Sequence, residues 1–236
     1  MYSNHLAHIH DSRFSDYARR IAPQLSRIIR ARGLPSSVVV EVGCGGGVLA
    51  RRLVDDGFEV HGIDISRAMI RIARARVPEA RFRVASLATT RIPACAAVVT
   101  IGEVVSYVPG GLQALARFFE RVHAALVPGG LLIFDFMESA RGRTYDMKSM
   151  AGDGWVLAAQ ASYDRATRIL TRRMAMVREG QTGRRHSRET HRVRIYSRQE
   201  MVVALRRVGF GVRTARAFGR VRLLRGDVAV ITVRNR

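Results

Sequence analysis

The chain has 236 residues, of which 47% are apolar, so it is long enough to bury a substantial core and is not a disordered segment. No apolar run approaches the roughly 20 residues that span a bilayer, and the N-terminus lacks the apolar stretch of a signal peptide. Two cysteines, Cys44 and Cys95, are no disulfide framework. We therefore expect one cytoplasmic domain with free thiols and no contact with a membrane.

The formal net charge of +21 raises the question of a nucleic-acid partner, because basic surfaces neutralise phosphates. Lys148 is the only lysine, so 39 of the 40 basic residues are arginines. Such a bias is typical of a GC-rich coding sequence, and we expect the arginines to be scattered over the surface. A nucleic-acid surface is the alternative interpretation.

Residues 1–35 predict an amphipathic helix that ends before Gly33, because apolar residues recur there at spacings of three and four. Its apolar face would carry Phe14, Tyr17, Ala18, Ile21, Ala22, Leu25, Ile28 and Ile29. His8 and His10 precede these apolar residues, but no second cluster of ligands accompanies them, so we predict no metal site.

Residues 38–49 organise the rest of the chain. The β-branched run at 38–42 predicts a strand buried on both faces, as in a parallel sheet, and four glycines then fall within five positions. Apolar residues from Val48 onward predict a helix. Strand, glycine turn and helix form the first βα unit of a doubly wound sheet, whose ligand sits beyond the C-terminal end of the strand. Glycines suit such a turn because a residue without Cβ adopts positive φ and approaches a ligand closely.

The spacing of these glycines decides between ligands. A dinucleotide fingerprint that starts at Gly43 requires glycine where Val48 stands, and the Gly-Lys-Ser/Thr of a phosphate loop is absent. The remaining pattern, Glu41-x-Gly43-x-Gly45-x-Gly47, resembles motif I of the class I S-adenosylmethionine-dependent methyltransferases. A buried acid without a lysine suits a cationic sulfonium better than a pyrophosphate. The resemblance implies a cofactor site that includes Glu41, Gly43, Cys44, Gly45 and Gly47.

A second predicted strand, residues 59–66, ends in an acid. Asp64 falls about 20 residues past the glycines, where a carboxylate accepts hydrogen bonds from ribose hydroxyls. Ser66 is the expected N-cap of the next helix. The run Gly-Ile-Asp-Ile-Ser with Met69 resembles the second motif of the same family. The resemblance implies that Asp64, Ile65 and Met69 contact the cofactor.

The third strand, predicted over residues 80–87, departs from the family pattern. The family usually has an aspartate at the place of Ser86, where it accepts from the adenine amino group. The resemblance implies that the Ser86 hydroxyl takes this role and that the Leu87 N–H donates to an adenine ring nitrogen. In the family, an aromatic near the start of the N-terminal helix often touches the ligand, which makes Tyr17 and Phe14 candidate cofactor contacts, with core packing of both as the alternative.

The loop that follows the fourth strand (residues 96–101) faces the transferring methyl group in this family. The loop lacks the Asn/Asp-Pro-Pro-aromatic signature of enzymes that methylate base nitrogens, and it lacks a Pro-Cys nucleophile. We therefore predict that Glu103 and Tyr107 contact cofactor or substrate, with Glu103 as a catalytic candidate. A structural role for both is the alternative.

Residues 155–196 interrupt the alternation of strands and helices. They follow a helix at 112–126, a Leu-x-Pro-Gly-Gly turn that again resembles the family, and a fifth strand at 131–136. Three extended segments joined by polar turns predict an antiparallel flap over the acceptor. Alternation in the last segment puts four residues on one face, and these are Glu189, His191, Val193 and Ile195. His191 is the candidate general base. A solvated flap strand is the alternative.

The chain ends with a helix at 198–208, capped by Ser197, and with strands at 211–218 and 227–233. The whole pattern predicts an α/β fold: a Rossmann-like, seven-stranded class I methyltransferase sheet with helices on both faces and an antiparallel β flap inserted after the fifth strand. The chain would be one domain, residues 1–236, with a helical lid at 1–35 and the flap at 155–196.

The resemblance implies transfer of a methyl group from S-adenosyl-L-methionine to a nitrogen or oxygen of a small molecule, with secondary metabolism as one expected setting. Two alternatives stay open. One is an RNA or other nucleic-acid methyltransferase, and the other is a non-catalytic homologue that only binds the cofactor. The sequence leaves the acceptor and the oligomeric state open.

Overall fold

The structure is a computed structural model that describes residues 11, 15–180 and 183–235; Phe14, His8 and His10 lie outside the described residues. Its larger sheet contains β1 (Val38–Val42), β2 (Glu59–Asp64), β3 (Arg81–Val84), β4 (Cys95–Thr100), β5 (Leu126–Met137), β10 (Phe210–Ala215) and β13 (Asp227–Arg234). The strand order is β10-β13-β5-β4-β1-β2-β3. β13 runs antiparallel to both neighbours, whereas β1 to β5 pair in parallel. The predicted seven-stranded sheet with a final antiparallel strand is confirmed.

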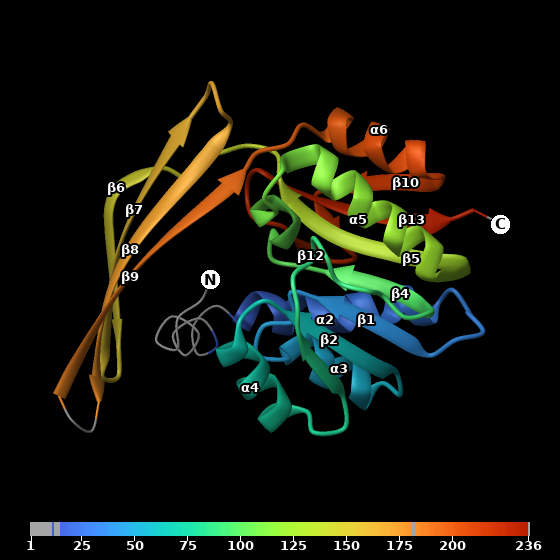
Figure 1. The fold of residues 1–236 in the computed structure, drawn as a ribbon, viewed down its shortest axis with the longest axis horizontal. Helices are drawn as coiled ribbons and strands as arrows, with labels where there is room; N and C mark the ends of the chain where they lie inside the picture. Colours follow the sequence, from blue (N-terminus) through green and yellow to red (C-terminus); the bar gives the residue numbers. More distant parts are fainter. Residues whose placement is uncertain (1–10, 12–14, 181–182, 236) are drawn as a thin grey trace.

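Helices cover both faces of this sheet, as predicted (Figure 1). On one face lie α2 (Ser15–Arg30), α3 (Val48–Asp55) and α4 (Arg67–Arg76), and on the other α5 (Gly111–Ala125) and α6 (Arg198–Val208). Successive side chains of a strand point to opposite faces. In β4, Val99 packs on the α2 side and Val98 on the α5 side. Every residue of β4 is buried, which explains its continuous apolar run.

The caps and turns place the helices as the sequence indicates. The Ser66 hydroxyl accepts a hydrogen bond from the N–H of Met69 at the start of α4. Ser197 and Glu200 form a reciprocal capping box at the start of α6. Gly47, at the start of α3, has a φ of 78°, and a Cβ there would lie 3.2 Å from the backbone of Ala73 in α4. Glycine at this position therefore lets α3 and α4 approach each other closely.

Three predicted boundaries differ from the structure. The predicted turn at 127–130 lies inside β5, which begins at Leu126 and has a register shift against β4. The predicted strand at 211–218 is divided into β10 and a short strand, β11 (Ala217–Phe218), which pairs with β12 (Val221–Arg222). After β4, the chain forms a single 3₁₀ turn, η1 (Val104–Tyr107), before α5. No helix among the described residues is long and apolar enough to cross a membrane.

A separate four-stranded antiparallel sheet follows β5, and we call it the flap. It contains β6 (Tyr145–Gly152), β7 (Trp155–Asp164), β8 (Ile169–Gly180) and β9 (Gly183–Arg194), in that order across the sheet. The flap stands to one side of the larger sheet (Figure 1). The three predicted segments are present. The flap also contains β6, which the sequence analysis did not predict, so it begins at residue 145 and not at residue 155. β6 is an exposed edge strand with a bulge, so it lacks the alternation that identifies strands.

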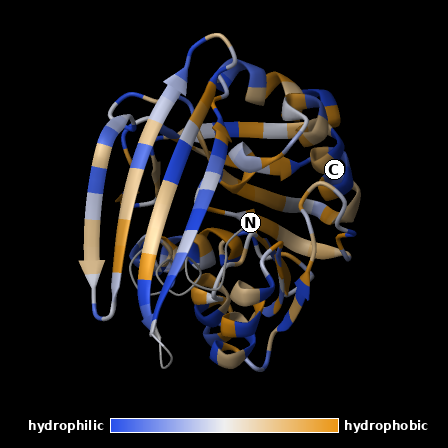
Figure 2. Cartoon of the chain, turned by 60° about the vertical axis from the view of Figure 1, so that its left-hand side comes forward, coloured by the Kyte–Doolittle hydropathy of each residue, from blue (hydrophilic) through white to orange (hydrophobic). Residues whose placement is uncertain are grey.

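The base of the flap packs against the larger sheet. Val193 and Ile195 are buried with Leu170 of β8 and Met137 of β5. The predicted face of the last flap strand is confirmed, since His191, Val193 and Ile195 are buried and Arg192 is exposed. Figure 2 shows hydrophilic and hydrophobic residues interleaved along the flap strands.

Candidate functional site

The site begins at the turn between β1 and α3, beside the crevice where the strand order reverses between β1 and β4. Gly43, Gly45 and Gly47 have φ angles of 75°, 51° and 78°, in the left-handed region that favours glycine. The Asp64 carboxylate, at the end of β2, joins this turn to the residue that precedes α4. One of its oxygens accepts from the N–H of Gly45 at 2.9 Å, and the other accepts from the N–H of Ser66 at 2.8 Å.

An exposed apolar surface lies next to this fixed carboxylate. Ile65 is 48% exposed and Val84 is 40% exposed, which is unusual for large apolar side chains in this molecule. Exposed apolar residues beside a fixed polar group are typical of a ligand-binding surface. Two hydrogen bonds hold the loop after β3. The Ser86 hydroxyl accepts from the N–H of Ala88 within the loop, and the Leu87 carbonyl accepts from Arg121 of α5.

Met69 lies elsewhere. Its side chain is 1% exposed and packs with Ala68 and Ile72. The structure therefore brings Asp64 and Ile65 together at the surface and keeps Met69 beneath it.

Two buried ionisable groups lie behind the turn. Burial, and then the charge of Asp64, raises the pKa of Glu41 to about 8. Glu41 Oε2 is buried and has no hydrogen-bond partner among the described residues. Burial also raises the pKa of the Cys44 thiol well above its usual value, which keeps it protonated. A buried carboxyl oxygen without a partner is costly, so this position fits a ligand that brings a donor or a positive charge.

A second cluster joins α2 to the loop after β4. The Tyr17 hydroxyl donates to Asp135 Oδ2 of β5, and Asp135 Oδ1 accepts from the N–H of Glu103 at 2.7 Å. Burial raises the pKa of Asp135 to about 6, although the Tyr17 hydrogen bond lowers it. Glu103 has a φ of 63°, which strains a residue other than glycine, and strained backbone is concentrated at functional sites.

The Glu103 side chain lies between two arginines. Arg143 Nη1 is 3.1 Å from Glu103 Oε1, and Arg172 Nη2, on flap strand β8, is 3.3 Å from Glu103 Oε2. Arg143 also contacts Asp227 Oδ2, at the start of β13, at 2.6 Å. Burial, followed by the charge of Glu103, raises the pKa of Asp227 to about 7. The cluster therefore connects the flap to the carboxyl ends of the larger sheet.

His191 lies next to this cluster. Its Nε2 is 3.0 Å from Glu189 Oε2, and its ring packs edge-on against Tyr107 with a centroid separation of 5.8 Å. The Tyr107 hydroxyl accepts from Arg172 Nη1 at 3.0 Å. The structure thus brings the predicted residues His191, Tyr107 and Glu103 together around Arg172.

Four polar residues of the cluster are absent from the sequence predictions. Asp135 had a signal, since it is an acid within an otherwise apolar strand. The sequence analysis predicted Asp227 only as the first residue of a strand. Arg143 and Arg172 had no signal that separates them from the other arginines of the chain.

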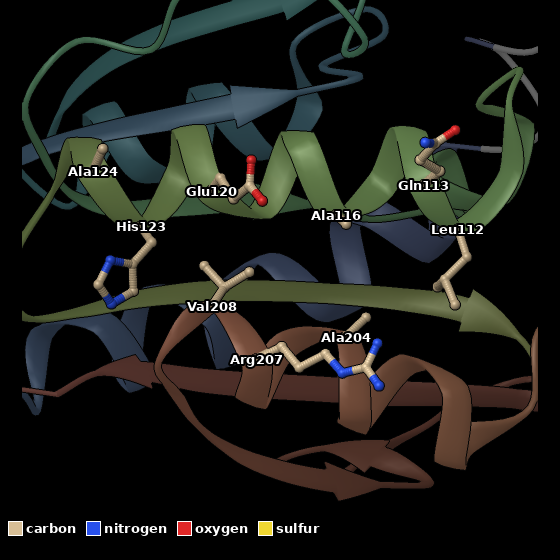
Figure 3. Close-up of a pocket in the computed structure, with 9 residues that line it drawn as sticks. All are labelled: Leu112, Gln113, Ala116, Glu120, His123, Ala124, Ala204, Arg207 and Val208. Atoms are coloured by element: carbon tan, nitrogen blue, oxygen red, sulfur yellow. The ribbon is translucent and has the colours of Figure 1, made fainter.

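A groove on the opposite face of the sheet lies away from these residues. It has a volume of about 600 Å³ and runs between α5 and α6, lined by residues such as Gln113, His123 and Arg207 (Figure 3). These helices cover the face of the sheet opposite α2. The groove therefore shares no residue with the site described above.

Comparison with known proteins agrees with this geometry. Residues 39–130 match the family described as "Methyltransferase domain". A ubiquinone biosynthesis O-methyltransferase of Alkalilimnicola ehrlichii is 36% identical over 43% of this chain and 42% of its own length. A dTDP-3-amino-3,6-dideoxy-alpha-D-glucopyranose N,N-dimethyltransferase of Streptomyces fradiae is 24% identical over 86% of this chain and 81% of its own. The chain spans about half the length of the relatives that are at least 30% identical to it.

Solved structures share the fold over nearly the whole chain. An S-adenosylmethionine-dependent methyltransferase from Clostridium acetobutylicum covers 99% of both chains with a TM-score of 0.85 and 13% identity. The sugar N-methyltransferase KedS8 from Streptoalloteichus covers 97% of this chain and 92% of its own, with a TM-score of 0.79 and 20% identity.

The fold is therefore that of the class I methyltransferases, with the glycine turn and Asp64 at the carboxyl ends of neighbouring parallel strands. The predicted resemblance is confirmed: residues 39–130 match the methyltransferase domain, and the chain shares its fold with a solved S-adenosylmethionine-dependent methyltransferase.

Proposed function

We propose that this chain transfers a methyl group from S-adenosyl-L-methionine to a nitrogen or oxygen of a small molecule. The observation that carries the proposal is the Asp64 carboxylate, which the amides of Gly45 and Ser66 fix beside the exposed Ile65. A fixed carboxylate at this strand end would accept from ribose hydroxyls, and Ile65 would pack against the adenine.

The other predicted cofactor contacts follow from the same placement. The buried Glu41 Oε2, which has no hydrogen-bond partner in the described part of the chain, fits a ligand with a donor or a positive charge. Tyr17 and Glu103 lie together through Asp135 at the far side of the crevice and would bind the amino acid end of the cofactor. When bound, S-adenosyl-L-methionine supplies an electrophilic methyl group. The residues of the chain have to align the acceptor with it and exclude water.

The flap supports a small-molecule acceptor. It is attached to the larger sheet after β5 and sends Arg172 and His191 to the loop after β4. We infer that it acts as the acceptor lid. The relatives named for sugar amines and for ubiquinone biosynthesis support a small acceptor over a nucleic acid. The two buried free thiols fit the expected cytoplasmic location.

An acceptor that must lose a proton needs a base, and we propose His191 for that role. The Glu189 carboxylate, 3.0 Å from its ring nitrogen, would stabilise the imidazolium that forms. The Glu103 carboxylate forms ion pairs with two guanidinium groups. Besides its proposed cofactor contact, we therefore assign the Glu103 side chain a positioning role, in which it holds Arg143 and Arg172.

The test of the proposed function is calorimetric titration with S-adenosylhomocysteine. Asp64→Ala and Gly45→Val should each weaken binding by about a hundredfold or more, because one removes the ribose acceptor and the other blocks the close approach. Asp146→Ala, on exposed strand β6, is the matched control and should bind like the wild type. Wild-type affinity in both site variants would refute the cofactor assignment.

A further inference from the structure

A groove lined by arginines lies between the loop after β5 and the loop before β13. It has a volume of about 420 Å³. Among the residues that line it are Ser139, Arg141, Arg216, Arg222, Leu224 and Arg225. We call it the arginine groove. Neither the predicted cofactor contacts nor the predicted acceptor contacts include any of these residues.

The two loops that form the groove are fixed to each other. The Gly226 carbonyl accepts from the N–H of Glu138 at 2.7 Å and from the N–H of Ser139 at 3.1 Å. Gly226 has a φ of 94°, and a Cβ there would lie 2.5 Å from the Ser139 carbonyl oxygen. Arg216 Nη1 donates to the Asp227 carbonyl at 2.9 Å. Backbone hydrogen bonds therefore hold the two loops together, so the shape of the groove does not depend on flexible side chains alone.

The groove concentrates positive charge. Four of its eight lining residues are arginines, and none is an acid, whereas arginine makes up 39 of the 236 residues of the chain. Arg216 forms an ion pair with Glu138 at 2.6 Å. The side chains of Arg141, Arg222 and Arg225 are exposed and make no ion pair or hydrogen bond with another residue in the described part of the chain. Three guanidinium groups are thus available to a ligand, which departs from the scattered distribution that a coding bias alone predicts.

The groove adjoins the proposed acceptor site. Gly226 is followed by Asp227, which pairs antiparallel with Met137 at the carboxyl end of β5. Arg143 donates to the Arg225 carbonyl and joins Asp227 to Glu103, with contacts of 2.6 and 3.1 Å. The contacts of Arg143 therefore connect the arginine groove to the loop after β4, which is part of the proposed acceptor site.

We propose that the arginine groove binds a phosphate or diphosphate group carried by the methyl acceptor. Guanidinium groups form paired, charge-assisted hydrogen bonds with phosphate oxygens, and this geometry suits arginine better than lysine. A volume of about 420 Å³ accommodates a diphosphate with part of its organic substituent. Leu224, which is 60% exposed, provides an apolar wall for that substituent. The assignment to the acceptor rests on the proposed function, whereas the anion site itself does not.

Binding of pyrophosphate tests the anion site directly. Calorimetric titration at 150 mM salt should show wild-type binding that weakens on the order of a hundredfold in the triple variant Arg141→Gln/Arg222→Gln/Arg225→Gln, because it loses three charge-assisted contacts. A matched triple variant, Arg117→Gln/Arg206→Gln/Arg213→Gln, removes the same charge from exposed positions of α5, α6 and β10 and should bind within about threefold of the wild type. Arg222→Gln alone, expected to lose about tenfold, guards against misfolding of the triple variant.

Equal losses in the two triple variants, or no binding to the wild type, would overturn the anion site. Tight wild-type binding of a 20-nucleotide RNA that displaces pyrophosphate would overturn it in favour of a nucleic-acid surface, and its salt dependence would reveal many phosphate contacts.

A second measurement separates an acceptor-borne phosphate from free phosphate. Release of S-adenosylhomocysteine from S-adenosylmethionine is followed with a metabolite extract, before and after treatment with a phosphodiesterase that cleaves bridging diphosphates together with alkaline phosphatase. This treatment should abolish the release, and the groove triple variant should lower it without changing affinity for S-adenosylhomocysteine. Release that is absent or survives this treatment overturns the assignment to the acceptor. If the wild type binds pyrophosphate but not S-adenosylhomocysteine, the proposed function fails and the anion site stands.

Discussion

The ionisation of Glu41 gives the sharpest test of the site. Glu41 is 3% exposed, and burial raises its pKa from an ordinary 4.5 to about 8. Because the folded-state pKa is above the unfolded value, the protonated form stabilises the fold. That stability is fully present below about pH 4.5 and is lost as the pH rises through about 8. Each pH unit in this window costs about 1.4 kcal/mol, so the loss approaches about 5 kcal/mol on the alkaline side.

Glu41→Gln replaces the titrating group by a neutral side chain of similar shape. The variant should therefore lack this pH dependence: relative to the wild type, its free energy of unfolding should rise by about 3 kcal/mol between pH 6 and pH 9. Urea denaturation of both proteins at the two pH values, without cofactor, measures the difference. Asp146→Asn, an exposed acid on β6, is the control and should follow the wild type. If Glu41→Gln also follows the wild type, the reasoning about a desolvated carboxyl is refuted.

Two further predictions concern the acceptor side and the turn. His191→Ala should lower turnover by roughly a hundredfold while leaving the affinity for S-adenosylhomocysteine unchanged, and the loss should shrink at high pH if hydroxide replaces the base; normal turnover, assayed by S-adenosylhomocysteine release, would mean that alignment alone drives the transfer. Gly47→Ala should destabilise the fold by about 1–3 kcal/mol, because Gly47 has a φ of 78° and a Cβ there would crowd Ala73. An unchanged denaturation midpoint would contradict this. Gly142→Ala is the control that separates backbone strain from crowding, because Gly142 has a φ of 75° but open space around it.

The geometry of the proposed cofactor half of the site could be predicted because its parts are close in sequence. The strand, the turn and the helix from residue 38 onward form one continuous pattern, and Asp64 stands at a fixed distance from it. The direction of each parallel strand then brings Asp64 to the glycine turn, where it accepts from Gly45. Local pattern and general topology suffice for such a site.

The acceptor half could not be predicted in the same way. Glu103 meets Arg143 and Arg172 across 40 and 69 positions of the sequence, and nothing in the sequence separates these arginines from the others. Their pairing depends on how the flap attaches to the larger sheet. Strand β6 was missed for a related reason: a bulged edge strand has little buried surface, so its sequence carries little alternation.

The charges around the crevice are separated in a way that orients a ligand. Three buried acids with raised pKa values lie along the carboxyl ends of the strands: Glu41 at about 8, Asp227 at about 7 and Asp135 at about 6. A cation placed among them would favour their ionised forms, so cation binding and proton release are coupled there. The guanidinium groups of the arginine groove that have no ion pair among the described residues lie near Asp227, around the loop that precedes β13. If both proposals hold, a cationic donor would be attracted to the centre and an anionic acceptor group to the periphery, and this separation would orient the two ligands before the reacting atoms meet.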